Sequence, residues 1–174
     1  MVNLQCNVRL NIKELLTVIH GCNHARQSLT EHLGGGGLDA ILLTLPLRRV
    51  VTADHPKMVA TSRAIVERLG AGQGLLYRYL PEESPDGIAG HEGAFLLCSF
   101  WLVDNLAKQR RLDEAIELYA SLCARAGPLG LLPEEIDPST GAFLGNYPQA
   151  FSHIGVISSG VNLARLLGKA GETH

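Results

Sequence analysis

Three apolar runs of the chain resemble one another in their pattern of hydrophobic positions. They cover residues 38–43, 92–97 and 148–153, and each holds an alanine at the corresponding place, at positions 40, 94 and 150. The separations of 54 and 56 residues are in the range of repeated helical hairpins. The runs predict three helices, at about residues 39–50, 93–108 and 149–167, that are apolar on nearly all sides because they are buried among other helices.

A more polar helix is expected after each of the first two runs. In residues 56–69, apolar positions recur at three- and four-residue steps among charged ones, and Gly70 follows as a helix stop. Residues 111–126 repeat this pattern and are followed by the helix-breaking pair of Gly127 and Pro128. The sequence therefore predicts an all-α fold in which inner and outer helices alternate.

Two long connections interrupt the helical pattern and hold most of the candidate chemistry. Residues 71–91 and 127–147 are rich in Pro, Gly, Asp and Glu, and connections of about 20 residues are often functional. Residues 74–79 predict a short extended segment, and residues 139–141 predict a turn. Since each connection leads into an inner helix, we expect their polar groups to meet at one end of the helical array.

Composition excludes several classes of protein. The chain has 174 residues with a formal net charge of −2, 46% hydrophobic and 18% charged residues, which is typical of one folded domain and neither of a disordered chain nor of a basic nucleic-acid binder. Its apolar runs are far shorter than the roughly 20 residues of a membrane span, and no secretory signal is recognisable at the start. We expect a cytoplasmic protein that binds neither nucleic acid nor membrane.

The cysteines and histidines do not predict a metal site or disulfides. The four cysteines form no CxxC pair, so free thiols are expected. His20, Cys22 and His24 lie close together in the sequence, but no fourth zinc ligand follows at a recognisable spacing. The four glycines at positions 34–37 lack the Gly-Lys-Ser/Thr of a phosphate loop and predict a flexible joint. We expect no metal and no cofactor.

Four segments of the chain carry a resemblance to a known family: residues 90–104, 111–115, 130–138 and 145–153. They resemble the C-terminal part of glycoside hydrolase family 15, which contains glucoamylases, glucodextranases and bacterial trehalases. The resemblance implies an (α/α)6 toroid of the six-hairpin glycosidase type, of which this chain supplies about the C-terminal half. It divides the chain into a non-matching segment at residues 1–33, a partial barrel domain at 34–168 and a tail at 169–174.

The resemblance also implies an inverting hydrolysis of α-glucosidic bonds. Such a reaction uses a carboxylic acid and a carboxylate base about 6.5–9.5 Å apart, with the attacking water beside the base. By its place before the Asp137-Pro138 turn, Glu134 matches the general base of the family, and Glu135 is the alternative. From composition alone, both would be explained as part of a solvated acidic loop or as charges at a helix N-terminus.

Four further residues are candidates for substrate binding. Arg78 and Tyr79 match an Arg-Tyr pair that holds the glucose unit in the family, and the alternative is a surface arginine lying over a tyrosine. Glu92 either binds sugar hydroxyls or favours a helix N-terminus. His153 either lines the pocket or is a hydrogen-bonded structural histidine. For Asp39 we expect a capping role.

The chain departs from the family at the general acid, which the family carries earlier, in a tryptophan-glutamate context that is absent here. One hypothesis is therefore a fragment of an α-glucoside hydrolase, acting on trehalose or a maltooligosaccharide and inactive without its N-terminal half. The other is an α-helical repeat module that binds a protein partner. A half barrel would expose the apolar runs at residues 38–47 and 94–102, so self-association is expected.

Overall fold

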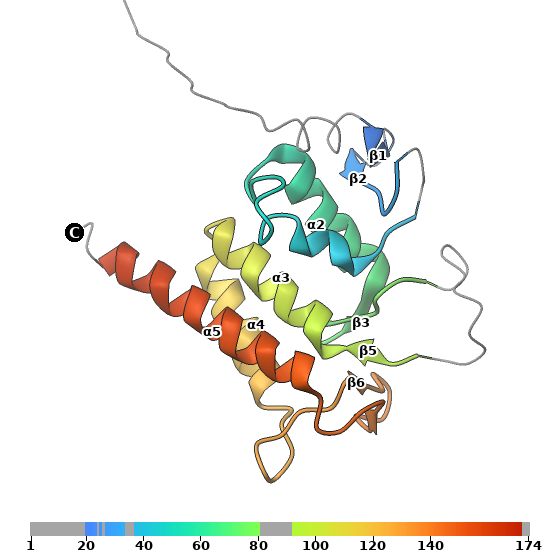
Figure 1. The fold of residues 1–174 in the computed structure, drawn as a ribbon, viewed down its shortest axis with the longest axis vertical. Coiled ribbons are helices and arrows are strands. Elements are labelled where there is room, and N and C mark those ends of the chain that lie inside the picture. The colour runs from blue at the N-terminus through green and yellow to red at the C-terminus, as the bar shows by residue number, and fades with distance from the viewer. Residues whose placement is uncertain (1–19, 24, 26, 34–36, 81–91, 172–174) are drawn as a thin grey trace, which may run out of the picture.

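The computed structural model describes residues 20–23, 25, 27–33, 37–80 and 92–171, and its core is a group of helices (Figure 1). Short two- or three-residue strands lie between the helices. In chain order the elements are β1 (Cys22–Asn23), β2 (Ser28–Leu29), the 3-10 helix η1 (Ala40–Thr44), α2 (Pro56–Leu69), β3 (Gly70–Gly72), β4 (Leu75–Leu76), β5 (Ala94–Phe95), α3 (Leu96–Lys108), α4 (Leu112–Cys123), β6 (Glu135–Ile136), β7 (Phe143–Leu144) and α5 (Ala150–Gly171).

Helix α3 is the centre of the fold. Ten of its thirteen residues are buried, and it packs against η1, α4 and α5 (Figure 1). Phe100, on the α5 side, is fully buried and meets Tyr119 of α4 edge to face, with ring centroids 6.1 Å apart. The predicted inner helix at residues 93–108 is therefore confirmed, except that it begins at Leu96 because residues 94 and 95 pair as a strand.

The prediction of a helix at residues 39–50 is wrong. The structure has only the five-residue 3-10 helix η1, followed by turns. Pro46 explains the difference, because a proline lacks the N–H of a helical bond and its ring clashes with the carbonyl four residues earlier. Asp39 caps η1 as expected, since its Oδ1 accepts a hydrogen bond of 2.7 Å from the Ile41 N–H.

The other three helices follow the hydrophobic pattern. Helix α2 has the predicted bounds, with Pro56 in its first turn and the His55 side chain accepting a hydrogen bond from the Lys57 N–H. Helix α4 is shorter than predicted, and α5 continues beyond its predicted end to Gly171. The turn at residues 139–141 is confirmed: Asp137 accepts hydrogen bonds from the Ser139 N–H and the Thr140 hydroxyl.

Buried polar contacts fix α3 against its neighbours. Asp104 is 2% exposed; its Oδ1 accepts a hydrogen bond of 2.9 Å from Asn162 Nδ2 and its Oδ2 accepts one of 3.2 Å from the Ser159 hydroxyl, both on α5. Burial raises the pKa of this carboxyl. On the other side of α3, Asn105 Nδ2 donates to the Leu43 carbonyl at 2.6 Å. Since buried polar groups need partners, these bonds specify one register for η1, α3 and α5.

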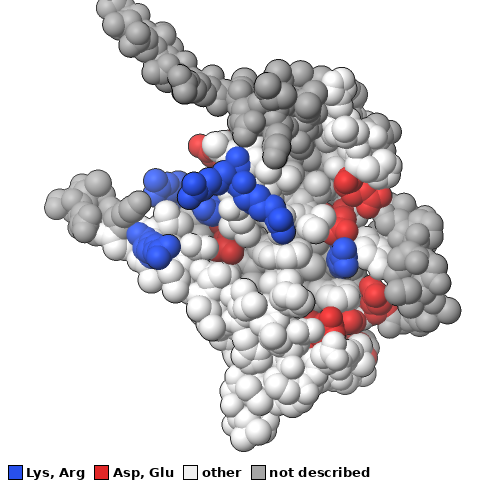
Figure 2. All heavy atoms as spheres, viewed as in Figure 1, with Lys and Arg blue, Asp and Glu red and all other residues white. Residues whose placement is uncertain are grey.

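One face of α5 is apolar and exposed. Phe151, Ile154 and Ile157 are 62%, 55% and 66% exposed, and Val161 continues the same stripe at helical spacing. In the view of Figure 2, a broad area without charged side chains covers this part of α5. The apolar surface expected at residues 38–47 and 94–102 lies elsewhere than predicted, because most of those residues are in the core.

None of the helices in the described ranges combines the length and the apolar character that a membrane crossing requires.

The contact between α3 and α5 predicts opposite effects for two glycine substitutions on α5. A Cβ at Gly155 would lie 2.8 Å from Phe100 Cδ2, whereas a Cβ at Gly168 would meet nothing within 4 Å. We expect Gly155→Ala to lower the free energy of unfolding by about 1–3 kcal/mol through overpacking. Gly168→Ala should raise it by up to about 1 kcal/mol. Denaturant unfolding of both variants checks this, and equal shifts for the two would contradict it.

The exposed face of α5 predicts self-association of the purified chain. We expect light scattering to detect dimers or larger species, because a contiguous apolar stripe of this kind is rarely left in water. Ile157→Lys should shift the distribution toward the monomer. Val66→Lys on α2 is the matched control, since Val66 is also exposed, at 46%, but lies on a different helix. A monodisperse wild-type monomer would refute this expectation.

Candidate functional site

A cavity of about 280 Å³ lies at the N-terminal end of α3. It combines two predicted site residues, Arg78 and Glu134, with apolar and aromatic side chains. As expected, residues from both long connections meet at this end of the helices, although residues 81–91 of the first connection are outside the described part. The lining residues are Ile41, Arg78, Phe95, Leu97, Cys98, Trp101, Glu134, Gln149, Phe151 and Ser152.

Glu134 is held in the cavity wall through one of its carboxylate oxygens. Its Oε2 accepts hydrogen bonds from the Asn146 backbone N–H at 3.0 Å and from Asn146 Nδ2 at 2.8 Å. No described residue donates a hydrogen bond to Oε1. The backbone is also fixed, because the Glu134 N–H donates to the Asn146 carbonyl and the Glu134 carbonyl accepts from the Leu96 N–H. Among the described residues, the carboxylate therefore has one anchored oxygen, Oε2, and one available oxygen, Oε1.

Glu135 lies next to Glu134 but does not line the cavity. In the antiparallel sheet β5-β6-β7 it pairs with Phe95, and its Oε2 accepts a hydrogen bond of 2.6 Å from the Gly93 N–H. Burial raises its pKa, the Gly93 bond opposes that effect, and the nearby Glu92 and Glu134 carboxylates add to it. Of the two adjacent carboxyls, the structure brings only Glu134 into the cavity.

Arg78 lines the cavity, and two neighbouring side chains, Asp39 and Tyr79, contact its guanidinium. Its Nε is 3.5 Å from Asp39 Oδ2, and its guanidinium carbon is 5.6 Å from the centroid of the Tyr79 ring. Asp39 is mostly buried; burial raises its pKa, while the Ile41 N–H and the Arg78 charge lower it. The guanidinium thus lies over a tyrosine, as the alternative interpretation expected, and also lines the cavity. Tyr79 is not part of the cavity wall.

His153 is a hydrogen-bonded histidine outside the cavity wall, as one of its two interpretations expected, and a contact with substrate stays a prediction. Its Nδ1 lies 2.7 Å from the Gln149 carbonyl, and its Nε2 accepts from the Leu132 N–H at 3.4 Å. A carbonyl only accepts, so Nδ1 carries the proton, and both ring nitrogens are engaged with backbone groups. Through the Leu132 N–H, His153 thus connects the start of α5 by a hydrogen bond to the segment that leads to Glu134.

Glu92 is exposed and does not belong to the cavity wall. It precedes β5, and α3 begins only at Leu96, so the interpretation that its charge favours the N-terminus of that helix is also not supported. Its charge acts on Glu135. A contact between Glu92 and a sugar stays a prediction.

Two residues next to the predicted ones were not singled out as candidates from the sequence. Asn146 belongs to a segment that carries the family resemblance, but only its place opposite Glu134 reveals its two hydrogen bonds. Trp101 belongs to the predicted inner helix at residues 93–108; it packs against the core and also lines the cavity, where it adds an aromatic wall.

No metal site is found in the part of the chain that the structure describes, where no three His, Cys, Asp or Glu side chains gather. Of the sequence cluster, His20 and Cys22 are described and His24 is not. The described cysteines, Cys22, Cys98 and Cys123, are free thiols, as expected. Burial raises the pKa of the Cys98 thiol to about 12, so it is protonated and unreactive at neutral pH.

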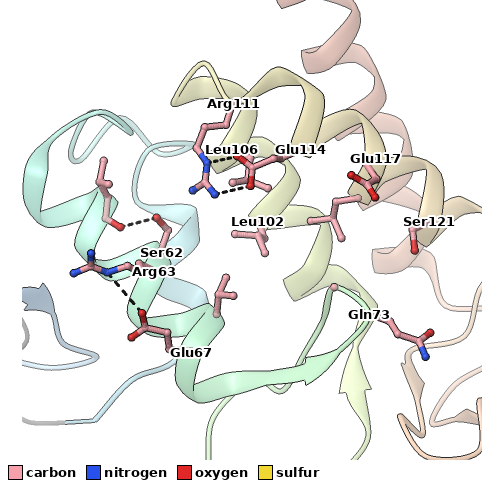
Figure 3. A pocket seen from close by; sticks show the side chains of 14 residues that line it. Ser62, Arg63, Glu67, Gln73, Leu102, Leu106, Arg111, Glu114, Glu117 and Ser121 are labelled. Atoms are coloured by element: carbon pink, nitrogen blue, oxygen red, sulfur yellow. Dashed lines mark hydrogen bonds and ion pairs between the residues drawn. The ribbon is translucent and has the colours of Figure 1, made fainter.

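A larger groove of about 680 Å³ lies between α2 and α4, with Leu102 and Leu106 of α3 in its floor (Figure 3). Its rims carry two ion pairs, Arg63 with Glu67 at 3.8 Å and Arg111 with Glu114 at 2.6 Å. It contains none of the predicted site residues. The smaller cavity is therefore the candidate functional site.

Comparisons with known proteins identify relatives of the chain. The sequence model described as "Glycosyl hydrolases family 15" matches residues 4–161. A trehalase of Mycolicibacterium smegmatis is 45% identical over 140 residues, which are 80% of this chain and 21% of the relative. A trehalase of Mycobacterium tuberculosis is 40% identical over 146 residues, 84% of this chain and 21% of the relative. The chain spans about one fifth of the length of these relatives.

Solved structures show the same fold. A chain described as "Glycosidase Wild Type" superposes with a TM-score of 0.69 at 22% identity, over 87% of this chain and 42% of the other. A variant glycosidase in complex with glucose gives the same TM-score at 21% identity. The predicted fold class, part of a helical toroid, is confirmed, and the helical-repeat binding module is not favoured. Since the match begins at residue 4, it includes most of the segment set apart at residues 1–33; the domain boundaries stay a prediction.

The raised pKa of Glu135 predicts a pH-dependent stability. A carboxyl whose pKa is raised by folding binds its proton more tightly in the folded state, so its contribution to stability falls as the pH rises from its ordinary pKa of 4.5 through the raised value. Glu135→Gln keeps an acceptor for the Gly93 N–H and removes the titration. We expect the variant to gain stability relative to the wild type as the pH rises over this range.

The measurement is the unfolding midpoint of both proteins from about pH 4 to 7. Glu117→Gln, on the exposed face of α4, is the control for loss of one negative charge. A difference between Glu135→Gln and the wild type that is the same at every pH would refute the prediction.

Proposed function

Because the chain belongs to glycosyl hydrolase family 15, we propose that it carries the water-activating part of a site that hydrolyses an α-glucosidic bond with inversion. One observation carries the proposal: Glu134 presents a carboxylate with one available oxygen to a cavity that also contains the Arg78 guanidinium. The assignment of Glu134 rather than Glu135 as the base rests on this geometry and on the sequence resemblance.

In the proposed reaction, Glu134 Oε1 takes a proton from a water molecule as the water oxygen attacks the anomeric carbon of the bound glucose unit. The bond between that carbon and the glycosidic oxygen breaks, and the leaving oxygen takes a proton from a carboxylic acid on the opposite side. Glu134 is the only carboxyl among the described residues of the cavity wall. The family resemblance puts the acid earlier, in a tryptophan-glutamate context that this sequence lacks, so we assign it to an N-terminal half of the toroid, the expected partner.

The remaining cavity residues are suited to a sugar. Arg78 has several N–H donors for hydroxyl groups, and its contacts with Asp39 and the Tyr79 ring hold the guanidinium in place. Phe95, Trp101 and Phe151 offer apolar surface for the C–H face of a pyranose ring. Hydrolysis by two carboxyl groups needs no metal or cofactor.

We propose trehalose as the substrate. The sequence alone left trehalose and maltooligosaccharides open. The relatives with 40% and 45% identity are named trehalases, which supports the first.

The proposal is tested best with a substrate that does not need the general acid. α-Glucosyl fluoride has a leaving group that departs without full protonation, so its hydrolysis requires only the sugar site and the base. We expect the purified chain to convert it to β-glucose and fluoride, and to release no glucose from trehalose. Glu134→Gln should lower the fluoride turnover by about 100-fold or more.

Glu135→Gln is the matched control, because it changes the neighbouring carboxyl, which lies outside the cavity wall. It should keep turnover within about threefold of the wild type. Loss of activity in Glu135→Gln instead of Glu134→Gln would contradict the base assignment. Absence of turnover in the wild type would contradict the proposal that this chain by itself carries the water-activating part.

A further inference from the structure

The loop of Gly145 and Asn146 is built around the carboxylate of Glu134. Asn146 directs two donors, its backbone N–H and its side-chain Nδ2, at the same oxygen, Oε2. The backbones of the two residues are joined as well, since the Glu134 N–H donates to the Asn146 carbonyl at 2.9 Å. Three hydrogen bonds between the same two residues define both the position and the rotation of the carboxyl group.

Gly145 allows this close approach. It has a φ of 68°, a left-handed conformation that L side chains rarely adopt, and a Cβ there would lie 2.8 Å from Glu134 Oε2 and 2.9 Å from Glu134 Cβ. A side chain at position 145 would therefore displace the carboxylate or the loop. Two neighbouring residues of the loop therefore act on Glu134 Oε2: Gly145 leaves space for this oxygen, and Asn146 donates hydrogen bonds to it.

The start of α5 holds the other side of this segment. The Ser152 hydroxyl donates to the Pro133 carbonyl at 2.7 Å, and the Gln149 N–H donates to the Leu132 carbonyl at 2.9 Å. Glu134 thus follows two residues that are hydrogen-bonded to the first turn of α5 and to the residue directly before it. With the backbone fixed on both sides, the remaining freedom of the carboxylate is rotation of its side chain, which the Asn146 amide restricts.

We infer that Asn146 is a positioning residue of the hydrolytic site: it anchors Glu134 Oε2 so that Oε1 meets the attacking water. This inference rests on the proposed function. Asn146 itself is assigned no contact with water or sugar. Its effect is on the orientation of the base, so its loss should slow the reaction without weakening the binding of the sugar.

The test uses the full chain and the hydrolysis of α-glucosyl fluoride. We expect Asn146→Ala to lower kcat by about tenfold or more and to leave KM within about threefold, because a misplaced base affects the transition state and not the sugar contacts. In a Glu134→Gln background, Asn146→Ala should cause no further loss, since it acts only through that carboxylate.

Asn162→Ala is the matched control. Asn162 also donates its side-chain amide to a carboxylate, Asp104 Oδ1 at 2.9 Å, but it lies between α3 and α5 and not at the cavity. We expect the free energy of unfolding to fall in Asn162→Ala as it does in Asn146→Ala, while kcat keeps the wild-type value. If Asn146→Ala does not fold, Asn146→Asp serves as the second variant, because it keeps the size and the backbone N–H but places a negative charge against Oε2.

The outcomes separate the inference from the proposed function. Turnover by the wild type that requires Glu134 and is unchanged in Asn146→Ala overturns the inference alone. A rise in KM with constant kcat also overturns it, since that would be a substrate contact. No turnover by the wild type overturns the proposed function, and the positioning role with it.

Discussion

The pairing of Ala94 and Phe95 with Glu135 and Ile136 joins the start of the central helix to the second long connection. This two-residue ladder is the direct backbone link between the segment with Glu134 and the start of α3, where the cavity lies. The ladder is reinforced next to the cavity, because the Leu96 N–H donates to the Glu134 carbonyl and the Gly93 N–H donates to the Glu135 carboxylate. A short sheet thus sets the geometry of a site in a helical protein.

The position of α3 depends in turn on polar side chains that it carries inside the core. Ser99, Asp104 and Asn105 are all buried, and each bonds a different neighbour: the β4 backbone, α5 and η1. Apolar packing alone tolerates sliding between helices, whereas a buried donor or acceptor that loses its partner costs roughly 1–3 kcal/mol. These three residues therefore hold α3 in one register against β4, α5 and η1.

The helices could be predicted because their hydrophobic periodicity is local, and α2 and α3 agree closely with it. The 3-10 helix could have been predicted from Pro46, whose effect on the backbone is also local. The two-residue strands could not, since they form only when distant segments meet. The site was likewise predicted only in part. Glu134 and Arg78 were found through a sequence resemblance. The hydrogen bonds of His153 and Asn146 depend on loop geometry, which the hydrophobic periodicity does not predict.

Phe151 belongs both to the cavity wall and to the exposed apolar stripe of α5, and the neighbouring Ser152 holds the carbonyl of Pro133, directly before Glu134. A molecule that packs on α5 therefore contacts the same helical turn that supports the segment of Glu134. The exposed apolar surface and the carboxylate are mechanically coupled in this arrangement. A shift of α5 on association would be transmitted to Glu134 through Ser152, Gln149 and His153, whose hydrogen bonds hold the two residues before it.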